Sequence, residues 1–333
     1  MGVESVNLLV TAPLDGASLE RIKSVSDRIK LTDASELLRT ERKGGSSTAK
    51  ELNALLAEAE VIYGFRLPKD LVRRAPKLKW VQVMSAGVDR FLEDEELRKS
   101  KVVLTNVSGI HGVPIGEFVL GLMLMFAKQA PLCFQLKQQR QWGRFVPTVL
   151  RSKTVGIVGL GSIGREVARL AKAFRMRVVA TRRSARGAGR ARYVDVLYPP
   201  DQLHRLLSES DFVVLALPLT PESKGLIGER ELRSMKPTAY LINVGRGEIV
   251  DEQALVRALE ERWIAGAGLD VFATEPLPAD SRLWELPNVI FSPHVAGGME
   301  DYVERATEVF CENLRRYLSG KRLLNVVNKE RGY

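Results

Sequence analysis

The chain contains only three histidines, and one of them has the surroundings of a reacting group. His294 lies in the stretch 291–298, which is rich in polar and small residues and directly follows a predicted strand. An imidazole gives and takes a proton near neutral pH, which suits an acid or a base in catalysis. His204 lies in a polar, helix-like context and is expected at the surface. His111 lies in a glycine-rich loop, where a hinge role is favoured over a place in a binding cleft.

Two further residues complete a candidate catalytic set. Glu275, next to prolines at 276 and 278, can accept a hydrogen bond from an imidazole, fix its tautomer and favour its charged form. Arg246 lies between two glycines just past a predicted strand end, where ligands of α/β proteins bind. Its guanidinium can hold a carboxylate through two hydrogen bonds. Together with His294, these residues suit the reduction of a carbonyl beside a carboxylate, although each taken singly could equally be structural.

A glycine motif in the middle of the chain indicates a nucleotide site. Gly159-Leu160-Gly161-Ser162-Ile163-Gly164 follows the apolar run 154–158 and opens a helix-like run. The first glycine allows a tight turn, the second lets a pyrophosphate approach the backbone, and the third lets helix and strand pack closely. The free N–H groups and the helix dipole favour the phosphates. This order predicts a dinucleotide-binding crossover, with contacts to the cofactor from Gly159, Gly161, Ser162, Ile163 and Gly164.

The end of the next predicted strand bears on which nicotinamide cofactor is bound. This position normally carries an acid that binds the ribose 2′-hydroxyl, but here the chain reads Thr181, Arg182, Arg183 and Ser184. Arginine forks and a hydroxyl would instead bind a 2′-phosphate. The nearest acid downstream, Asp195, is too far along the chain to serve. The sequence therefore predicts NADP(H) over NAD(H), with NAD(H) left open, because more arginines follow and the run could be a solvated loop.

The order of the predicted elements indicates an α/β fold with two Rossmann-like domains, each a doubly wound parallel sheet. The first series has strands at 6–10, 61–63, 80–84 and 102–105, with helices at 19–25 and 49–59. A helix at 114–126 leads away from it. The second series has strands at 154–158, 177–181, 212–216, 239–243, 265–269 and 289–291, with helices at 162–174, 201–208, 229–234 and 251–261.

The last forty residues are expected to return to the first domain, because an amphipathic helix at 299–319 follows the second series. We therefore expect a discontinuous substrate-binding domain, residues 1–105 plus 296–333, and a dinucleotide-binding domain, residues 106–295. The active site would lie in the cleft between them.

Composition excludes several other classes of protein. The chain has 333 residues, 45% of them hydrophobic, and a net charge of +10. Its longest apolar run, 118–130, is too short to span a bilayer, and the first four residues do not resemble a signal peptide. Two cysteines are too few for a disulfide framework, so a cytoplasmic location is the expectation. The arginines are spread out and no zinc spacing or RNA-binding signature occurs, so we expect no metal, no nucleic acid and no membrane partner.

Several motifs in a fixed order make the chain resemble the D-isomer-specific 2-hydroxyacid dehydrogenases over nearly its whole length. Besides the glycine motif, they are Ser85-Ala86-Gly87-Val88-Asp89, Leu217-Pro218-Leu219-Thr220, Asn243-Val244-Gly245-Arg246-Gly247, Leu269-Asp270-Val271-Phe272, Glu275-Pro276-Leu277-Pro278 and Ser292-Pro293-His294-Val295-Ala296-Gly297.

The resemblance implies roles for the residues in these motifs. Arg246, Glu275 and His294 would be the catalytic set, and Ser85, Ala86 and Gly87, with Arg246, would bind the substrate carboxylate. The cofactor would further be bound by Leu217, Pro218, Thr220, Val244, Gly245, Asp270, His294 and Gly297, with Asp270 at the carboxamide. The family is typically a homodimer joined through the nucleotide domains, and the segment carrying Trp142 resembles the part that reaches the neighbouring subunit.

Departures from the family pattern narrow the branch. Arg182 replaces the usual acid, as in NADP-using glyoxylate and hydroxypyruvate reductases. Formate dehydrogenases have Gln where Glu275 stands, which disfavours that branch. The expected reaction is reduction of a 2-oxo acid to the D-2-hydroxy acid by NADPH, with His294 giving the proton.

Two alternatives stay open: a nucleotide-sensing scaffold like the co-repressor relatives, and an NAD-dependent dehydrogenase of another small anion. The side chain of the 2-oxo acid also stays open. The stretch 63–67 is expected at the mouth of the cleft, with Met84 beneath it. There, Arg66 would favour a second acidic group and Phe65 an aliphatic or aromatic one.

Overall fold

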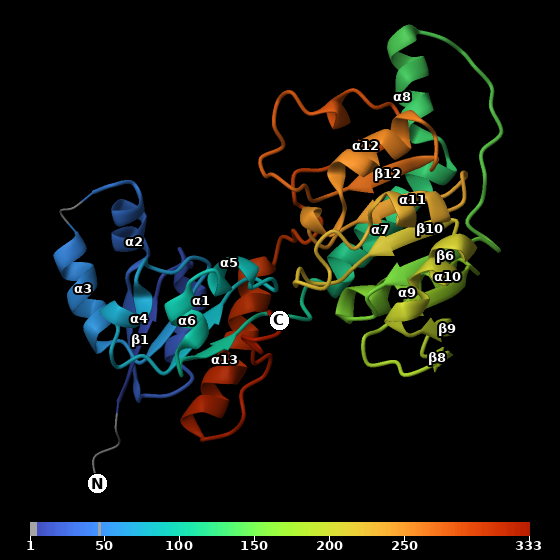
Figure 1. Cartoon of the computed structure of the whole chain (residues 1–333). Helices are drawn as coiled ribbons and strands as arrows, with labels where there is room; N and C mark the ends of the chain where they lie inside the picture. Colours follow the sequence, from blue (N-terminus) through green and yellow to red (C-terminus); the bar gives the residue numbers. More distant parts are fainter. Residues whose placement is uncertain (1–4, 46–47) are drawn as a thin grey trace. The chain divides into compact units, whose positions relative to one another are not determined.

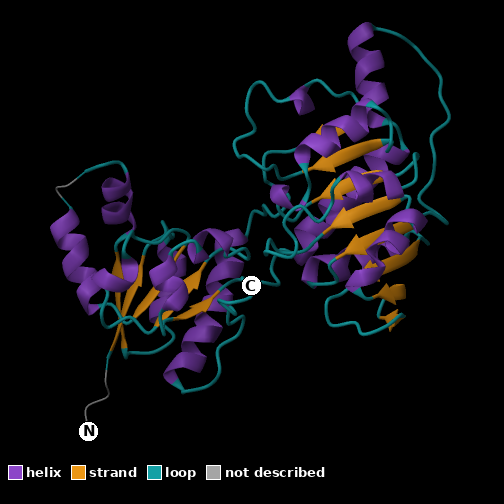
Figure 2. Ribbon diagram, in the orientation of Figure 1, coloured by secondary structure: helices purple, strands orange, loops and turns teal. Residues whose placement is uncertain are grey.

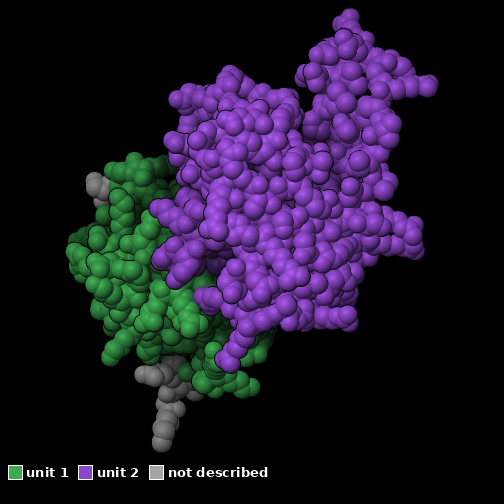
Figure 3. Space-filling model, turned by 45° about the vertical axis from the view of Figure 1, so that its right-hand side comes forward, with its two compact units in different colours: residues 1–110, 299–333 green, residues 111–298 purple. Residues whose placement is uncertain are grey.

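The computed structural model describes residues 5–45 and 48–333. The first four residues, on which the expectation of no signal peptide rests, lie outside this part. The chain forms two compact units (Figure 3), residues 1–110 with 299–333 and residues 111–298, here called the first and the second unit. The limits expected from the sequence, after residues 105 and 295, lie a few residues earlier.

The first unit is built on a parallel sheet with helices packed around it (Figure 1). The sheet has five strands in the order β2-β1-β3-β4-β5. Its strands are β1 (Val6–Val10), β2 (Ile29–Asp33), β3 (Val61–Gly64), β4 (Trp80–Val83) and β5 (Val103–Thr105). Its helices are α1 (Gly16–Lys23), α2 (Ser35–Arg42), α3 (Ala49–Glu58), α4 (Leu71–Arg74), α5 (Asp89–Leu92), α6 (Glu95–Lys99) and α13 (Tyr302–Leu318).

Successive strand residues of this sheet pack on opposite sides, which identifies the two helical layers. Leu9 and Ile62 join one core cluster with leucines of α2, α3, α4 and α6. Leu8 and Val61 join the other cluster, with apolar residues of α1 and α13. Both faces of the parallel sheet are therefore covered, as the doubly wound fold requires.

The second unit contains a larger sheet, whose strands are drawn in orange in Figure 2. It has eight strands in the order β13-β12-β11-β10-β6-β7-β9-β8. Its strands are β6 (Thr154–Val158), β7 (Arg177–Thr181), β8 (Gly189–Ala191), β9 (Val194–Tyr198), β10 (Phe212–Leu215), β11 (Tyr240–Asn243), β12 (Gly266–Leu269) and β13 (Val289–Phe291). Its α-helices are α7 (Gly112–Ala127), α8 (Ala130–Gln139), α9 (Ser162–Ala173), α10 (Leu203–Glu209), α11 (Glu229–Ser234) and α12 (Glu252–Glu260). Three short 3-10 helices are η1 (Pro200–Gln202), η2 (Gly247–Ile249) and η3 (Arg282–Trp284).

The same alternation divides the core of the second unit. One cluster joins Ile157 and Val214 to α7 and α9, and the other joins Val213 and Leu241 to α10, α11 and α12. The fold class expected from the sequence, two Rossmann-like α/β units, is confirmed.

Several elements differ from the expectation. The second sheet has eight strands where the sequence predicts six, because the arginine-rich stretch after β7 turns back as β8, which pairs antiparallel with β9. β2 was not predicted, since its residues are only partly buried or exposed and include charged Lys30 and Asp33. The short helices α2, α4, α5 and α6, and the exposed helix α8, were also not predicted.

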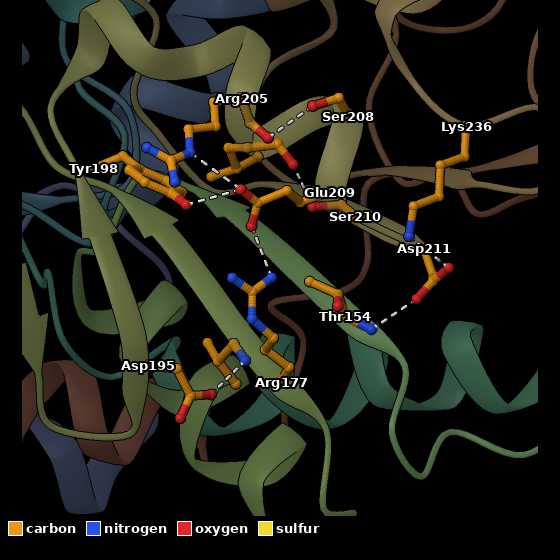
Figure 4. A network of polar contacts seen from close by, with 12 residues as sticks. Thr154, Arg177, Asp195, Tyr198, Arg205, Ser208, Glu209, Ser210, Asp211 and Lys236 are labelled. Carbon is orange, nitrogen blue, oxygen red and sulfur yellow. Dashed lines mark hydrogen bonds and ion pairs between the residues drawn. The ribbon is translucent and has the colours of Figure 1, made fainter. Parts of the chain in front are cut away.

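Charged residues at the amino ends of β6, β7 and β10 bind one another (Figure 4). Glu209 accepts hydrogen bonds from the Tyr198 hydroxyl at 3.0 Å and from Arg205 at 3.2 Å, and pairs with Arg177 at 2.7 Å. Asp211 accepts the backbone N–H at the start of β6 at 2.8 Å and pairs with Lys236 at 3.0 Å. Both carboxylates at this edge of the sheet therefore have cationic and hydrogen-bonding partners within the unit.

No single helix in the described residues is long and apolar enough to cross a membrane. Only α7 and α8 taken together, with a 58° bend between them, reach the required length and composition. The apolar residues of α7, including Val119 and Met123, are buried in the core of the second unit.

Candidate active site

The candidate residues of the second unit lie in loops that follow the carboxyl ends of its parallel strands. The loops begin after β6, β7, β10, β11, β12 and β13, which are neighbours in the sheet. Backbone hydrogen bonds join these loops in series, from Ala216 N to Val158 O, from Val244 N to Leu215 O and from Asp270 N to Asn243 O. The sheet thus gathers residues that are more than a hundred positions apart in the sequence onto one edge, where ligands of such folds bind.

The glycine turn after β6 fits a pyrophosphate by three independent measures. Gly159 has a φ of +103°, and a Cβ there would lie 2.7 Å from Ala216 O. A Cβ on Gly164 would lie 2.3 Å from Gly159 O, so α9 can approach the turn only through glycine. A Cβ on Gly161 would meet no atom within 4 Å, which leaves open space at the N-terminus of α9. Ser162 and Ile163 occupy the first turn of this twelve-residue helix, whose N–H groups suit an anion.

The residues after β7 lie beside this turn. Leu160 N donates to Thr181 O at 3.0 Å, and Thr181 is buried while Arg182, Arg183 and Ser184 are exposed. Asp195 is held elsewhere, because its carboxylate accepts the backbone N–H of Val178 at 2.8 Å and pairs with Lys172. Burial acts to raise the pKa of Asp195, but the Val178 N–H and Lys172 outweigh that effect, so the pKa lies below its ordinary value. The cationic end of β7 thus carries arginine forks and no acid of its own.

A compact turn follows β10. Thr220 N donates to Ser223 Oγ at 2.7 Å, and Ser223 Oγ donates to Pro218 O at 2.7 Å. Leu217 packs against the neighbouring core cluster, and its carbonyl would lie 2.8 Å from a Cβ on Gly245. The loops after β10 and β11 therefore approach closely at a position that only glycine permits.

The loop after β11 orients Arg246. Asn243 donates through Nδ2 to Arg246 O at 2.9 Å and accepts Gly245 N at 3.1 Å, which closes the loop on itself. A Cβ on Gly247 would lie 1.8 Å from the Phe272 carbonyl carbon, so the loops after β11 and β12 touch backbone to backbone. The Asn243 contacts were not recognised in the sequence, where Asn243 appears only as a member of a motif.

Glu275 and His294 are brought together by the loops after β12 and β13. His294 Nδ1 lies 2.9 Å from Glu275 Oε2, while Glu275 Oε1 accepts Phe272 N at 3.2 Å. The carboxylate can only accept, so Nδ1 carries the proton in this contact and Nε2 is the ring nitrogen directed to other partners. The His294 side chain is 45% exposed and that of Glu275 is 22% exposed, so the pair is accessible from solvent.

Asp270 holds the loop that carries His294 in place through hydrogen bonds. Its buried carboxylate accepts hydrogen bonds from Ser292 Oγ at 2.7 Å, Val295 N at 2.8 Å and Ala296 N at 3.1 Å. Its carbonyl accepts His294 N at 2.8 Å, and His294 adopts a left-handed φ of +55°. Asp270 therefore shapes this loop, a role that neither composition nor spacing indicates.

His111 lies at the start of the second unit, close to the loop that ends it. A Cβ on Gly297 would meet His111 Cδ2 at 2.9 Å, so the imidazole packs against that glycine. Burial, and then the charge of Arg246, lower the pKa of His111 below its ordinary value. His111 is therefore held as a neutral ring near neutral pH, whereas His204 pairs with Glu231 on the surface, as expected.

Ser85, Ala86 and Gly87 form a loop after β4 in the first unit. Ser85 Oγ donates to Gly87 O at 2.8 Å, and Asn106 Nδ2 donates to Ala86 O at 2.8 Å. Within residues 5–45 and 48–333, no acceptor is recorded for the backbone N–H groups of these three residues. Successive N–H groups of this kind suit a carboxylate.

Comparisons with known proteins show the family to which the chain belongs. A model of the NAD-binding domain of the D-isomer specific 2-hydroxyacid dehydrogenases matches residues 120–296. The glyoxylate reductase of Korarchaeum cryptofilum is 38% identical over 267 residues, 78% of this chain and 79% of its own. The glyoxylate/hydroxypyruvate reductase B of Pectobacterium carotovorum is 39% identical over 287 residues, 83% of this chain and 87% of its own.

A solved structure extends the likeness to both units. The NADPH-dependent glyoxylate/hydroxypyruvate reductase of Sinorhizobium meliloti, in complex with NADP and sulfate, has a TM-score of 0.83 at 27% identity. The match covers 99% of this chain and 100% of that one.

Two doubly wound units, a glycine turn and a His–Glu pair on one sheet edge define a nicotinamide-dependent oxidoreductase. The chain belongs to the D-isomer specific 2-hydroxyacid dehydrogenase family, which confirms the resemblance drawn from its motifs. As a member of that family, it acts between 2-oxo acids and 2-hydroxy acids.

Proposed function

We propose that the protein reduces a 2-oxo acid to the D-2-hydroxy acid with NADPH, and that it accepts glyoxylate and hydroxypyruvate. The observation that carries the proposal is the 2.9 Å contact of His294 Nδ1 with Glu275 Oε2, on the sheet edge that also bears the glycine turn. The names of the relatives, glyoxylate reductase and glyoxylate/hydroxypyruvate reductase, support these substrates.

Different residues of the chain bind the substrate carboxylate and transfer the proton. The N–H groups of Ser85, Ala86 and Gly87 and the guanidinium of Arg246 bind the substrate carboxylate. A reduced nicotinamide, when bound, supplies the hydride to the carbonyl carbon. His294 gives its Nε2 proton to the carbonyl oxygen, and Glu275 stabilises the imidazolium before that transfer and holds its tautomer.

The cofactor would be held by the loops of the second unit. The glycine turn and the first turn of α9 take the pyrophosphate, and Leu217, Pro218 and Thr220 line the nucleotide. Val244, Gly245, Asp270 and Gly297 are assigned to the nicotinamide end, where Asp270 keeps its carbonyl and carboxylate bound to the His294 loop. Asp270 acts there chiefly as a positioning residue.

A catalytic test compares two histidines of the chain. His294→Gln should lower kcat by about 10²-fold or more, because a general acid contributes about that much, and should leave the Kd for NADPH unchanged. His204→Gln is the matched control, since His204 contacts Glu231 on the surface at 3.3 Å and should keep full activity. A near-normal kcat in His294→Gln would remove the assigned role. Tight cofactor binding without turnover of any 2-oxo acid by the wild type would favour the scaffold alternative.

The preference for NADPH rests on the end of β7. Arg182, Arg183 and Ser184 are exposed and follow Thr181 without an intervening acid, so they suit a 2′-phosphate. Arg182→Asp should lower kcat/KM for NADPH by about tenfold or more, the value of one charge-assisted contact, while NADH is affected little. Arg190→Asp, in the same arginine run, is the control. Equal losses in the two variants, or a wild-type kcat/KM for NADH at or above that for NADPH, would contradict the preference.

We further propose a homodimer in the cytoplasm, with the arm after α7 as part of the interface. The arm comprises α8 and residues 140–150, and it exposes the large apolar side chains of Phe134, Trp142, Val146 and Val149. Trp142 is 94% exposed within the chain, which is costly for an indole in water. Light scattering after gel filtration should give a dimer for the wild type and more monomer for Trp142→Ser.

A further inference from the structure

The first unit contains a cavity of about 640 Å³ at the carboxyl edge of its sheet. Residues after β1, β3 and β4 line it, together with α2 and the start of α13. This volume lies in the range of about 300–1,000 Å³ that holds drug-sized ligands. A two-carbon or three-carbon acid would fill only a small part of it.

The walls of the cavity are apolar. Leu38 and Met84 are buried, and Phe65 and Val303 contribute partly exposed apolar surface. An aliphatic or aromatic group placed here would lose contact with water, which favours binding by about 25 cal/mol for each Å² buried.

The rim of the cavity is cationic. Arg39, Arg42, Lys43 and Arg66 line it, and Glu36 is the only carboxylate among the lining residues. Glu36 pairs with Arg39 at 2.6 Å. No carboxylate partner is recorded for Arg42, Lys43 or Arg66 within the described part of the chain. Three of the four cations are thus available for an anionic ligand group.

One residue that lines the cavity directly precedes, in the chain, the loop that we assign to the substrate carboxylate. Met84 lines the cavity and is followed directly by Ser85. The Tyr302 hydroxyl donates to Met84 O, and Tyr302 also lines the cavity, so this junction is held in place by α13. A 2-oxo acid anchored at residues 85–87 can therefore extend its side chain into the cavity.

We propose that this cavity is a side-chain subsite for larger 2-oxo acids, those with an apolar chain that ends in a carboxylate or a phosphate ester. The apolar walls take the chain, and Arg42, Lys43 and Arg66 bind the distal anion. The inference rests on the proposed 2-oxo acid reduction and deepens it. The sequence left open whether the substrate carries a second acidic group, which Arg66 would favour, or an apolar group, which Phe65 would favour. In this subsite the two residues contact different parts of one ligand.

Matched pairs of substrates test the subsite. We would measure kcat/KM with NADPH for 2-oxoadipate against 2-oxohexanoate and for 2-oxosuberate against 2-oxooctanoate, with glyoxylate as the reference substrate. The ω-phosphate ester of a 2-oxo acid of similar length forms a second arm, which distinguishes phosphate from carboxylate. We expect the distal anion to raise kcat/KM by about tenfold in at least one pair, the value of about 1.4 kcal/mol.

Variants assign that preference to the cavity. Arg42→Gln and Lys43→Gln should each reduce the ratio within the favoured pair by about two- to fivefold, as expected for exposed charge pairs. Lys30→Gln and Arg322→Gln, which remove exposed charges of the first unit outside the cavity, should leave the ratio unchanged. Phe65→Ser should lower kcat/KM for both members of a pair of long substrates more than it does for glyoxylate.

The outcomes separate this inference from the proposed function. Reduction of glyoxylate with no advantage for a distal anion in any pair would overturn the subsite and keep the reductase. A preference that persists in the double variant of Arg42 and Lys43 would also overturn it. Absence of turnover with every substrate and both cofactors would instead refute the proposed function.

Discussion

The substitution Glu275→Gln tests the central pair of the site with almost no change of shape. The carboxylate accepts two N–H donors, Phe272 N at 3.2 Å and His294 Nδ1 at 2.9 Å. A glutamine offers one acceptor oxygen and one NH₂ group, so it cannot accept both donors. Either the loop loses its bond to Phe272 N, or the NH₂ group faces the ring and forces His294 into the other tautomer. In both cases the imidazolium loses its counter-charge.

The loss can be bounded from the geometry. A hydrogen bond to a charged group contributes about 1.5–3 kcal/mol. His294 is 45% exposed and Glu275 is 22% exposed, so solvent screening reduces that contribution to about 1–2 kcal/mol. This corresponds to about a 5- to 30-fold loss in kcat. The loss is well below the roughly 10⁴-fold seen when the buried aspartate of a serine protease triad becomes asparagine.

Steady-state kinetics at saturating NADPH and 2-oxo acid would measure kcat, and fluorescence titration would measure the Kd for NADPH. Nitrogen-15 spectra of labelled histidine would report the tautomer of His294. Glu231→Gln is the matched control, because Glu231 contacts the surface residue His204. A kcat within twofold of wild type, or a loss of equal size in the control, would refute the reasoning.

Three further predictions concern the framework of the second unit. Gly247→Ala should lower the free energy of unfolding by roughly 1–3 kcal/mol and should also lower kcat, because its Cβ would lie 1.8 Å from Phe272. Gly121→Ala is the control: its Cβ meets nothing within 4 Å inside helix α7, so it should raise the free energy of unfolding by up to about 1 kcal/mol and leave turnover unchanged. In His111→Gln, the free energy of unfolding should depend less on pH below about 6.5 than it does in the wild type. Burial and a nearby arginine lower the pKa of His111 from 6.5, so the unfolded wild type binds a proton more readily than the folded state does. The free energy of unfolding of the wild type therefore falls as pH drops below about 6.5. Identical slopes of the free energy of unfolding against pH for the two proteins would contradict this. Asp211→Ala should cost about 1–3 kcal/mol in denaturant titration by leaving a buried N–H without its acceptor, yet leave KM for both substrates unchanged, because it lies at the opposite edge of the sheet.

The nucleotide side of the site was predictable because its determinants are local in sequence. The glycines of residues 159–164 lie within six residues of one another, and Arg182 and Arg183 are adjacent and follow β7 directly. The strands before them, β6 and β7, are almost entirely buried. Backbone φ values and Cβ contacts then agree with the roles assigned to Gly159 and Gly164.

The parts that were missed depend on contacts between distant segments. Asp270 reaches the loop that begins at Ser292, and only the parallel pairing of β12 with β13 brings the two together. β2 and α2 were missed because an exposed edge strand and a short charged helix lack a strong apolar period. Yet α2 carries Arg39 and Arg42 to the cavity of the first unit, so the sequence could suggest Arg66 and Phe65 but not the surroundings that unite them.

The distribution of paired and unpaired charge distinguishes the functional edge of each sheet from the structural one. At the amino ends of β6, β7 and β10, Glu209 and Asp211 are each bound by a cation and by further donors, so that edge has little left to offer a ligand. At the carboxyl edges, the N–H groups of residues 85–87 and three of the cations beside the first-unit cavity, Arg42, Lys43 and Arg66, have no such partners in the described part of the chain. Polar groups that have no internal partner are available to an anionic ligand, and a row of such N–H groups suits a carboxylate. On the proposed function, two groups of exposed cations, one after β7 and one beside α2, would each bind the anionic group of a small ligand.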